Sequence, residues 1–313
     1  MVALDVFAVA FAVAWLLRLS LGAWSWPFPM LLHGWTIAGP LFVAGAIVAV
    51  LRRRIAAGAL HVLLLAPWIV QHVPRLARER VDSGADLSLV TLNTGVRRTA
   101  PEELARWVLE SRADVVFLQE VGDVQAAELE QTCASEYPWR LLHGMGLRGM
   151  GVLSRHPLAD VREIALPDET LALVGTVELG GQRVAFADVH LSGWVALLGP
   201  WGDGDESLDL VLRELAGAET AVLAGDFNQT SESPLLDRVR AAGFTDVFDS
   251  CGRGLGLSFP VFRRYRGIPL PPVVRIDHVF VRGALLAVDA FTLPGAGSDH
   301  RALQARCLRA ASE

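Results

Sequence analysis

The segment AVLAGDFN, residues 221–228, constrains the fold of this chain more than any other stretch. Its small and apolar residues predict a buried strand, which runs through Gly225 into Asp226 and Asn228. Two residues apart on one strand share a face, so we expect a carboxylate and a carboxamide side by side. Such a pair can hold a metal ion or a water molecule and stabilise an oxyanion. An ordinary Asx turn explains the same residues equally well, and the rest of the chain must decide.

The N-terminal quarter of the chain is strongly apolar. The chain has 313 residues, 52% of them hydrophobic, and a mean hydropathy of +0.38, which is high for a soluble enzyme. Three apolar stretches, at about 2–21, 30–51 and 55–73, approach the roughly 20 residues that span a bilayer. We therefore expect a transmembrane region of three helices over residues 1–73. A cleaved signal peptide or buried core helices are the alternatives.

Arginines indicate the orientation of these helices, because the chain contains no lysine. Arg52, Arg53 and Arg54 lie between the second and third stretches, which favours a cytoplasmic position for that connection. We therefore expect a multi-pass protein of the cell membrane whose remaining domain is extracytoplasmic. Arg75 and Arg78 follow the third stretch and nearly balance the count.

The charge of the remaining chain argues against a nucleic-acid partner. Residues 82–313 contain 21 arginines against 32 acids, a formal charge of −11. Proteins that bind long nucleic acids normally present a basic surface to the phosphates. Nucleic acid is therefore an unlikely ligand, and no protein partner is evident. Three cysteines fall in no metal-binding spacing.

After a linker over residues 74–85, strand and helix patterns alternate through one domain, 86–313. Thr99 and Glu102 predict a capping box at the start of a helix over 99–112. Gly180 and Gly181 predict a hairpin turn. The mixture of strands and helices indicates an α/β fold in which two sheets pack face to face and are covered by helices.

Polar residues recur where buried strands end. They stand in the segments LSLVTLN (Asn93), DVVFLQE (Glu120), VAFADVH (Asp188, His190), AVLAGDFN (Asp226, Asn228), VVRIDHVFV (Asp277, His278) and SDH (Ser298, Asp299, His300). If these ends converge, their carboxylate and amide oxygens suit Mg²⁺ or Mn²⁺, and the histidines supply acid–base chemistry. Six such ends predict an active site rather than a turn.

These blocks, in this order, resemble the endonuclease/exonuclease/phosphatase superfamily with its DNase-like, four-layer α/β/β/α sandwich. The matching segments are TLN, FLQE, DVHL, GDFN, IDHVFV and SDHRAL, from about Leu87 to Leu303. The resemblance implies a divalent-metal-dependent hydrolase of phosphoric esters or anhydrides. It assigns Glu120, Asn93 and Asp299 to the metal environment.

The resemblance also implies catalytic roles. Asp226 would orient or deprotonate the attacking water, and Asn228 would bind phosphate oxygens. His300 would stabilise charge on the scissile phosphate and Asp277 would orient His300, while His190 would be a second histidine facing the phosphate. The segment around Arg155 also matches the family, so that its guanidinium either touches phosphate or forms a structural ion pair.

Two apolar loops depart from a nuclease pattern. One contains Trp194 and Trp201, and the other contains Phe259 and several prolines next to Arg263 and Arg264. Such loops fit a lipid phosphate at a membrane surface, although they could simply pack on the domain.

We therefore expect a membrane-anchored phosphohydrolase acting on a lipid-linked phosphate or diphosphate. The architecture resembles the VanJ-type teicoplanin-resistance membrane proteins, which implies undecaprenyl pyrophosphate as substrate. A sphingomyelinase-like phosphodiesterase, a tethered nuclease and a catalytically inactive binding module are the alternatives. The last requires loss of a catalytic residue, and all of them are present.

Overall fold

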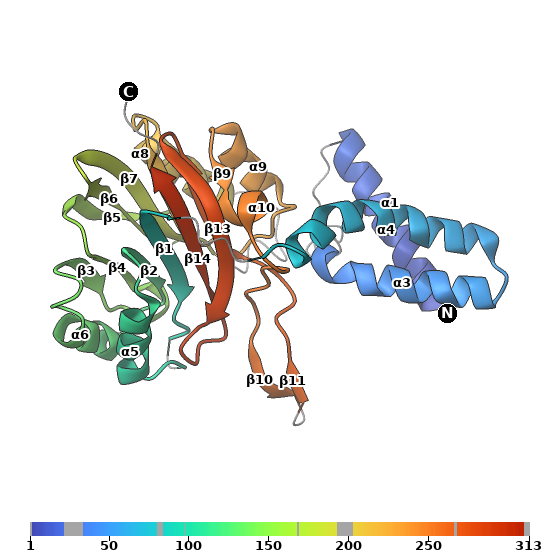
Figure 1. The fold of residues 1–313 in the computed structure, drawn as a ribbon, viewed down its shortest axis with the longest axis horizontal. Coiled ribbons are helices and arrows are strands. Elements are labelled where there is room, and N and C mark those ends of the chain that lie inside the picture. The colour runs from blue at the N-terminus through green and yellow to red at the C-terminus, as the bar shows by residue number, and fades with distance from the viewer. Residues whose placement is uncertain are drawn as a thin grey trace.

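The computed structural model describes residues 2–21, 34–79, 84–96, 98–167, 169–192, 203–265 and 268–309. It shows an N-terminal helical unit beside an α/β domain (Figure 1). The helical unit contains α1 (Val2–Leu21), α3 (Trp35–Leu51) and α4 (Ile55–Leu76). Aromatic rings join the three helices. Phe11 of α1 lies edge-on to Phe42 of α3, with ring centroids 5.6 Å apart, and Trp68 of α4 donates to the Thr36 carbonyl oxygen.

The expectation of three membrane-spanning helices is not supported. Helices do form at all three apolar stretches, but among the described residues only Ile55–Leu76 is long and apolar enough to cross a bilayer. Within the described residues, the other two apolar helices, Ala3–Leu16 and Trp35–Leu51, are shorter. The 17 residues of α3 extend over about 26 Å, less than the roughly 30 Å of a hydrocarbon core.

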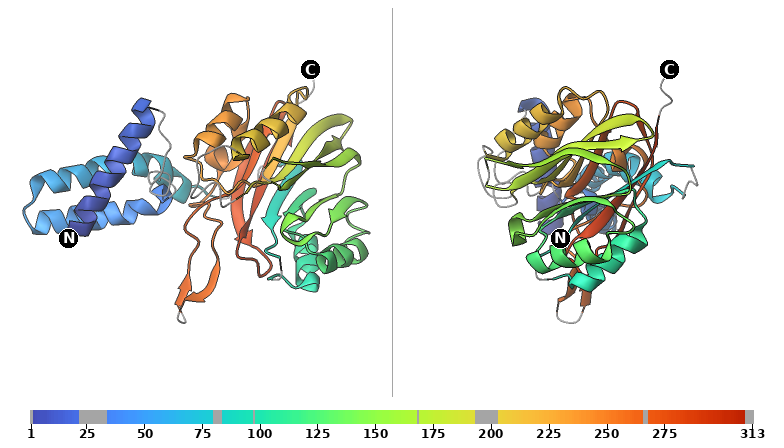
Figure 2. Two further views of the ribbon diagram at one scale, coloured as in Figure 1. Left: turned by 180° about the vertical axis from the view of Figure 1, so that it is seen from behind. Right: turned by 90° about the vertical axis from the view of Figure 1, so that its left-hand side faces the viewer.

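Two six-stranded sheets form the α/β domain (Figure 2). The first has the order β13 (Leu285–Pro294), β14 (Arg301–Arg309), β1 (Leu87–Asn93), β2 (Val115–Gln119), β4 (Met150–Ser154) and β3 (Trp139–His143). The second has the order β5 (Leu158–Ala165), β6 (Leu171–Leu179), β7 (Gln182–His190), β8 (Ala221–Asp226), β12 (Asp277–Arg282) and β9 (Thr245–Asp246). The remaining elements are α5 (Pro101–Ser111), α6 (Asp123–Thr132), η1 (Gly146–Arg148), α8 (Asp203–Leu215), α9 (Pro234–Ala241), α10 (Val247–Cys251), β10 (Phe262–Tyr265) and β11 (Ile268–Leu270).

Alternation along the strands divides the apolar residues into three layers of core. Inward-facing residues of both sheets meet in the middle, where Phe117 and Phe186 lie 5.6 Å apart. Outward-facing residues of the first sheet, such as Val116, pack on α5 and α6. Those of the second sheet, such as Leu223, pack on α8 and α9. The result is the α/β/β/α sandwich that the sequence predicts.

Local predictions had mixed outcomes. The Gly180–Gly181 turn joins β6 to β7 as expected, with φ of 57° and 86°. The capping box at Thr99 is wrong: α5 starts at Pro101, and the Thr99 hydroxyl donates to the Thr94 carbonyl oxygen instead. The apolar segment after Phe259 is a hairpin of β10 and β11, which projects from the sandwich (Figure 1).

Candidate active site

Strand direction brings the six polar strand ends to one edge of the sandwich. β1 and β2 are parallel, so Asn93 and Glu120 leave the first sheet together. β7 and β8 are also parallel, with His190 opposite Asp226. β12 and β14 run antiparallel to these neighbours and begin at the same edge, which places Asp277 opposite Asp226. The predicted convergence is therefore present in the fold.

Asn93 connects the two sheets. Its Nδ2 donates to Glu120 Oε1 at 3.1 Å and to Asp226 Oδ2 at 2.9 Å. Glu120 has a φ of 56° and also accepts from the Val96 N–H at 3.1 Å. This αL conformation is costly for a residue with a side chain and is common at functional sites. The Glu120 carboxylate is thereby held at the sandwich edge with 18% of its side chain exposed.

Asp226 forms an Asx turn and also contributes a carboxylate oxygen to the site. Its Oδ1 accepts from the Asn228 N–H at 2.9 Å, which is the Asx turn. Its Oδ2 faces the site. β8 ends at Asp226 and Asn228 has a φ of 52°, so strand alternation does not set the direction of the amide. Gly225 is required here, because a Cβ would lie 2.0 Å from the Val189 carbonyl oxygen.

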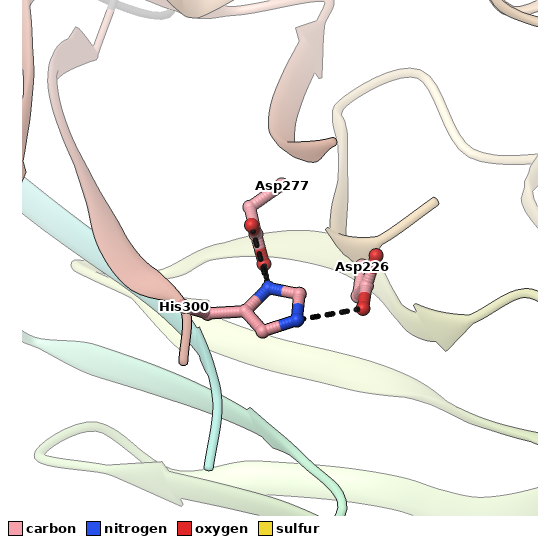
Figure 3. A group of neighbouring side chains, drawn as sticks. All are labelled: Asp226, Asp277 and His300. Atoms are coloured by element: carbon pink, nitrogen blue, oxygen red, sulfur yellow. Dashed lines mark hydrogen bonds and ion pairs between the residues drawn. The ribbon is translucent and has the colours of Figure 1, made fainter. Parts of the chain in front are cut away.

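His300 forms a buried group with two aspartates (Figure 3). Its Nδ1 lies 3.0 Å from Asp277 Oδ2, and its Nε2 lies 3.8 Å from Asp226 Oδ2. Burial alone would lower the pKa of His300, but the carboxylates of Asp277 and Asp226 outweigh it and raise the pKa to about 9. The ring is therefore an imidazolium at neutral pH, suited to stabilising an anion. Burial also raises the pKa of Asp226, which increases its affinity for a proton.

His190 and Asp299 complete the edge. His190 Nε2 lies 3.8 Å from Glu120 Oε1 and 3.9 Å from Asp226 Oδ2. The Asp299 carboxylate pairs with Arg98 Nε at 3.3 Å. A Cβ on Gly95 would lie 2.8 Å from Asp299 Oδ1, so the carboxylate stands against the loop that follows β1.

The donor set fits a divalent cation. Four carboxylates gather at this edge, those of Glu120, Asp226, Asp277 and Asp299. Arg98 pairs with the carboxylate of Asp299. Carboxylate and amide oxygens are the ligands that Mg²⁺ and Mn²⁺ prefer. By distance alone, the closest potential ligand group is Asp226, Asp277 and His300, within 4.8 Å of one another. Because Asp277 is occupied in holding His300, Glu120 and Asn93 remain the better candidates for a cation.

Arg155 is not part of this cluster. Ser154, at the end of β4, pairs with Val115, whereas Met150 pairs with Gln119 near the site. Arg155, five residues after Met150, therefore lies beyond the opposite edge of the sheet, about 17 Å away at 3.4 Å per residue. Its guanidinium forms the structural alternative, an ion pair with Glu136 at 3.4 Å.

Four other predicted substrate contacts lie outside the part of the chain that the structure describes. Trp194 and Trp201 fall within residues 193–202, which are not described. Arg263 and Arg264 belong to β10, whose backbone alone is described. Their roles stay predictions.

Two residues lie behind the site in contacts that the sequence did not predict. Phe259 packs on the His300 ring, with centroids 4.6 Å apart. Asp188, one of the polar residues near the end of β7, is fully buried between the sheets and accepts from Gln119 Nε2 at 2.5 Å. Its Oδ2 has no hydrogen-bond partner among the described residues. Burial raises the pKa of Asp188 well above its usual value. The alternation along β7 could have indicated this burial, because Asp188 lies two residues after Phe186 and therefore on the same, inward face of the strand.

Asp188→Asn should stabilise the protein at pH 8. The folded state holds the Asp188 proton more tightly than the unfolded state, so stability falls as pH rises above about 4, by up to about 1.4 kcal/mol per unit until the folded-state pKa is passed. Asparagine keeps an acceptor for Gln119 and has no proton to lose. Thermal unfolding from pH 5 to 8 should show a smaller decline for the variant. Equal declines would refute a neutral Asp188.

A buried network of charges lies behind Asp277. Arg275 donates to Asp246 at 3.0 Å, and Asp246 also contacts His278 Nδ1 at 3.0 Å. His278 Nε2 lies 2.9 Å from the Gln229 carbonyl oxygen, next to Asn228. His278 is thus a core residue that fixes the strand next to Asp277 and the loop next to Asp226.

The fold is shared with several solved structures. A mannosyl-6-phosphatase from Bacteroides thetaiotaomicron has a TM-score of 0.58 and 17% identity, covering 71% of this chain and 99% of that one. Danio rerio TDP2, complexed with a single-stranded DNA product, has a TM-score of 0.57 and 19% identity over 71% and 98% of the chains. A protein of the endonuclease/exonuclease/phosphatase family from Leptotrichia buccalis has a TM-score of 0.57 and 16% identity over 71% and 99%.

One curated relative matches only in part. An N-(5'-phosphoribosyl)anthranilate isomerase from Agrobacterium fabrum is 26% identical over 131 residues, which are 42% of this chain and 55% of that protein. The chain thus spans about half the length of this relative.

The family model gives a clearer result. It matches residues 90–300, about two thirds of the chain, and these limits enclose every polar strand end named above, from Asn93 to His300. The chain belongs to the endonuclease/exonuclease/phosphatase family, whose members are divalent-metal-dependent hydrolases of phosphoester bonds.

Proposed function

We propose that this protein is a membrane-associated phosphohydrolase that acts on a lipid-linked phosphate or diphosphate. The observation that carries the proposal is an apolar pocket beside the candidate active site. It has a volume of about 200 Å³ and is lined by Asn228, Thr230, Phe259, Pro260, Val273, Val274 and Ile276. Asn228 follows Asp226 closely in the chain and its Nδ2 donates to the Leu191 carbonyl oxygen, and Phe259 packs on His300. An apolar group attached to a bound phosphate would therefore have a place beside it.

Each residue of the site has a separate role in an in-line attack of water on phosphorus. Asp226, whose pKa is raised, accepts a proton from the water, and the imidazolium of His300 stabilises charge on the phosphate oxygens. Asp277 orients His300. Glu120 and Asn93, with Asp299 beside them, would hold the divalent cation, which when bound neutralises phosphate charge.

The helical unit supports a location at the membrane. α4 has the length and composition of a spanning helix, and α1 and α3 pack against it. The turn of Arg52, Arg53 and Arg54 lies at the end of the α3–α4 hairpin that is remote from the α/β domain (Figure 1). With that turn on the cytoplasmic side, the α/β domain would stand outside the cytoplasm at the cell membrane.

A direct comparison of substrates tests the proposal. The detergent-solubilised chain would be given undecaprenyl pyrophosphate, sphingomyelin or plasmid DNA with Mg²⁺. We expect phosphate release from the first. Undecaprenyl pyrophosphate is chosen because the architecture resembles the VanJ-type proteins. Turnover of sphingomyelin alone would favour a phosphodiesterase, and DNA nicking without lipid turnover would refute the proposal.

Val273→Asp should reduce kcat/KM for the lipid substrate by about tenfold or more, because it places a charge in the apolar pocket. Val273 is 36% exposed, so the fold should tolerate the change. Hydrolysis of a small soluble phosphate ester should change little. Leu286→Asp, on a 61% exposed residue of β13, is the matched control. Equal losses on both substrates would show that the pocket does not bind the apolar group.

A further inference from the structure

A groove of about 560 Å³ lies along the α3–α4 hairpin, next to its arginine turn. Its walls are apolar and small, and come from both helices. They include Ala46, Ala49 and Val50 of α3, and Ile55, Gly58 and Val62 of α4. The groove is separate from the candidate active site, which lies in the α/β domain beyond the other end of the hairpin (Figure 1).

The groove exposes much apolar surface. Val50 is 74% exposed, Ile55 is 87% exposed and Val62 is 57% exposed. Gly58 leaves the floor open: a Cβ there would meet Ala49 Cβ at 3.5 Å, an ordinary contact, so a larger side chain would have to extend into the groove. A concave apolar surface of this kind is favourably covered by a hydrocarbon chain.

Positive charge marks one end of the groove. Arg53 and Arg54 both line it. Arg54 pairs with Asp5 of α1, so its charge is neutralised from the side of α1. Arg53 has no carboxylate within ion-pair distance among the described residues, and Arg52 beside it has none either. An uncompensated guanidinium at the end of an apolar groove complements an anionic headgroup on an acyl chain.

We propose that this groove binds a phospholipid with an anionic headgroup, whose acyl chain covers Gly58 and whose phosphate lies at Arg53. The inference rests on the proposed location at a membrane and not on the hydrolytic reaction. A zwitterionic lipid could offer the same chain, but its headgroup has no net charge to complement Arg53. The site would fix the depth of the hairpin in the leaflet that contains the arginine turn.

The test uses the full chain in an uncharged detergent. Phosphatidylglycerol or phosphatidylcholine with identical acyl chains is added, and retained lipid is counted by native mass spectrometry. We expect about fivefold tighter retention of phosphatidylglycerol, since one arginine contributes about 1 kcal/mol to binding of anionic lipid. Soluble glycerol phosphate should not bind, because it has no chain for the groove. Equal retention of the two lipids, or binding of glycerol phosphate alone, would overturn the proposal.

Two variants separate chain from charge. Arg53→Gln should remove the preference for phosphatidylglycerol, and Gly58→Leu should reduce retention of both lipids by filling the groove. Gly58→Ala is the matched control and should retain binding. Arg148→Gln, on an exposed arginine of the α/β domain, controls for general charge. Unchanged preference in Arg53→Gln refutes the headgroup site even if Gly58→Leu fails to fold. Hydrolysis in detergent should persist in both variants, so failure of the lipid site and failure of the proposed function are distinguishable.

Discussion

Asp226→Asn should lower kcat by about a thousandfold or more while leaving the fold intact. The substitution preserves shape, and asparagine Oδ1 can still accept from the Asn228 N–H and close the Asx turn. What is lost is the group that takes the proton from water, a step that contributes about 10²- to 10⁴-fold. The attraction between Asp226 and the His300 ring is lost as well, since their polar atoms lie 3.8 Å apart.

The measurement is hydrolysis of the proposed lipid phosphate substrate at saturating concentration, with circular dichroism to verify folding. Asp160→Asn provides the matched control, because Asp160 has a 78% exposed side chain on β5. Its activity should match that of the unmodified protein. An Asp226→Asn protein that retains a tenth of the original kcat would refute the assigned role of Asp226.

Glu120→Gln should weaken binding of a divalent cation by at least about a hundredfold. Losing even a group that supports a metal ligand typically costs 10- to 100-fold, and Glu120 is assigned as a ligand itself. Glutamine fits the same αL position and can still accept from the Val96 N–H, but it carries no charge. Activity should fall in parallel, and a large excess of Mg²⁺ should restore part of it.

Titration calorimetry with Mn²⁺ measures the affinity directly and requires no substrate. Glu103→Gln, on an exposed residue of α5, is the control and should bind Mn²⁺ like the unmodified protein. Unchanged affinity in Glu120→Gln would place the cation elsewhere, with the group of Asp226, Asp277 and His300 as the next candidate.

The sequence predicted which polar strand ends gather at one edge, because local patterns indicate where each strand ends. Asn93 and His190 end buried strands and Glu120 directly follows one, and such residues meet when neighbouring strands run parallel. Strand direction also explains why Arg155 lies away from the site. It follows a strand that runs antiparallel to β2, so the end of that strand points away from the site.

Contacts between distant segments could not be predicted. Arg275 pairs with Asp246, 29 residues earlier, and nothing in either local pattern identifies the partner. Phe259 could be recognised as apolar from the sequence, but its packing on His300 depends on where the chain turns after Ser258. The hydrogen bond from Gln119 to Asp188 likewise depends on how the two sheets pack face to face, because the two residues lie on β2 and β7.

The end of α4 bears on how the site meets its substrate. Arg75 donates to Asp249 of α10 at 3.1 Å, and Arg78 donates to the Ser250 carbonyl oxygen at 3.1 Å. Asp249 in turn accepts from Arg275 at 2.5 Å, so the joint is continuous with the network behind Asp277. These contacts restrain the movement of the α/β domain relative to α4, unlike a connection through a flexible tether alone. If the substrate is a lipid phosphate, as proposed, encounters would then depend on its lateral diffusion in two dimensions and not on the reach of the enzyme.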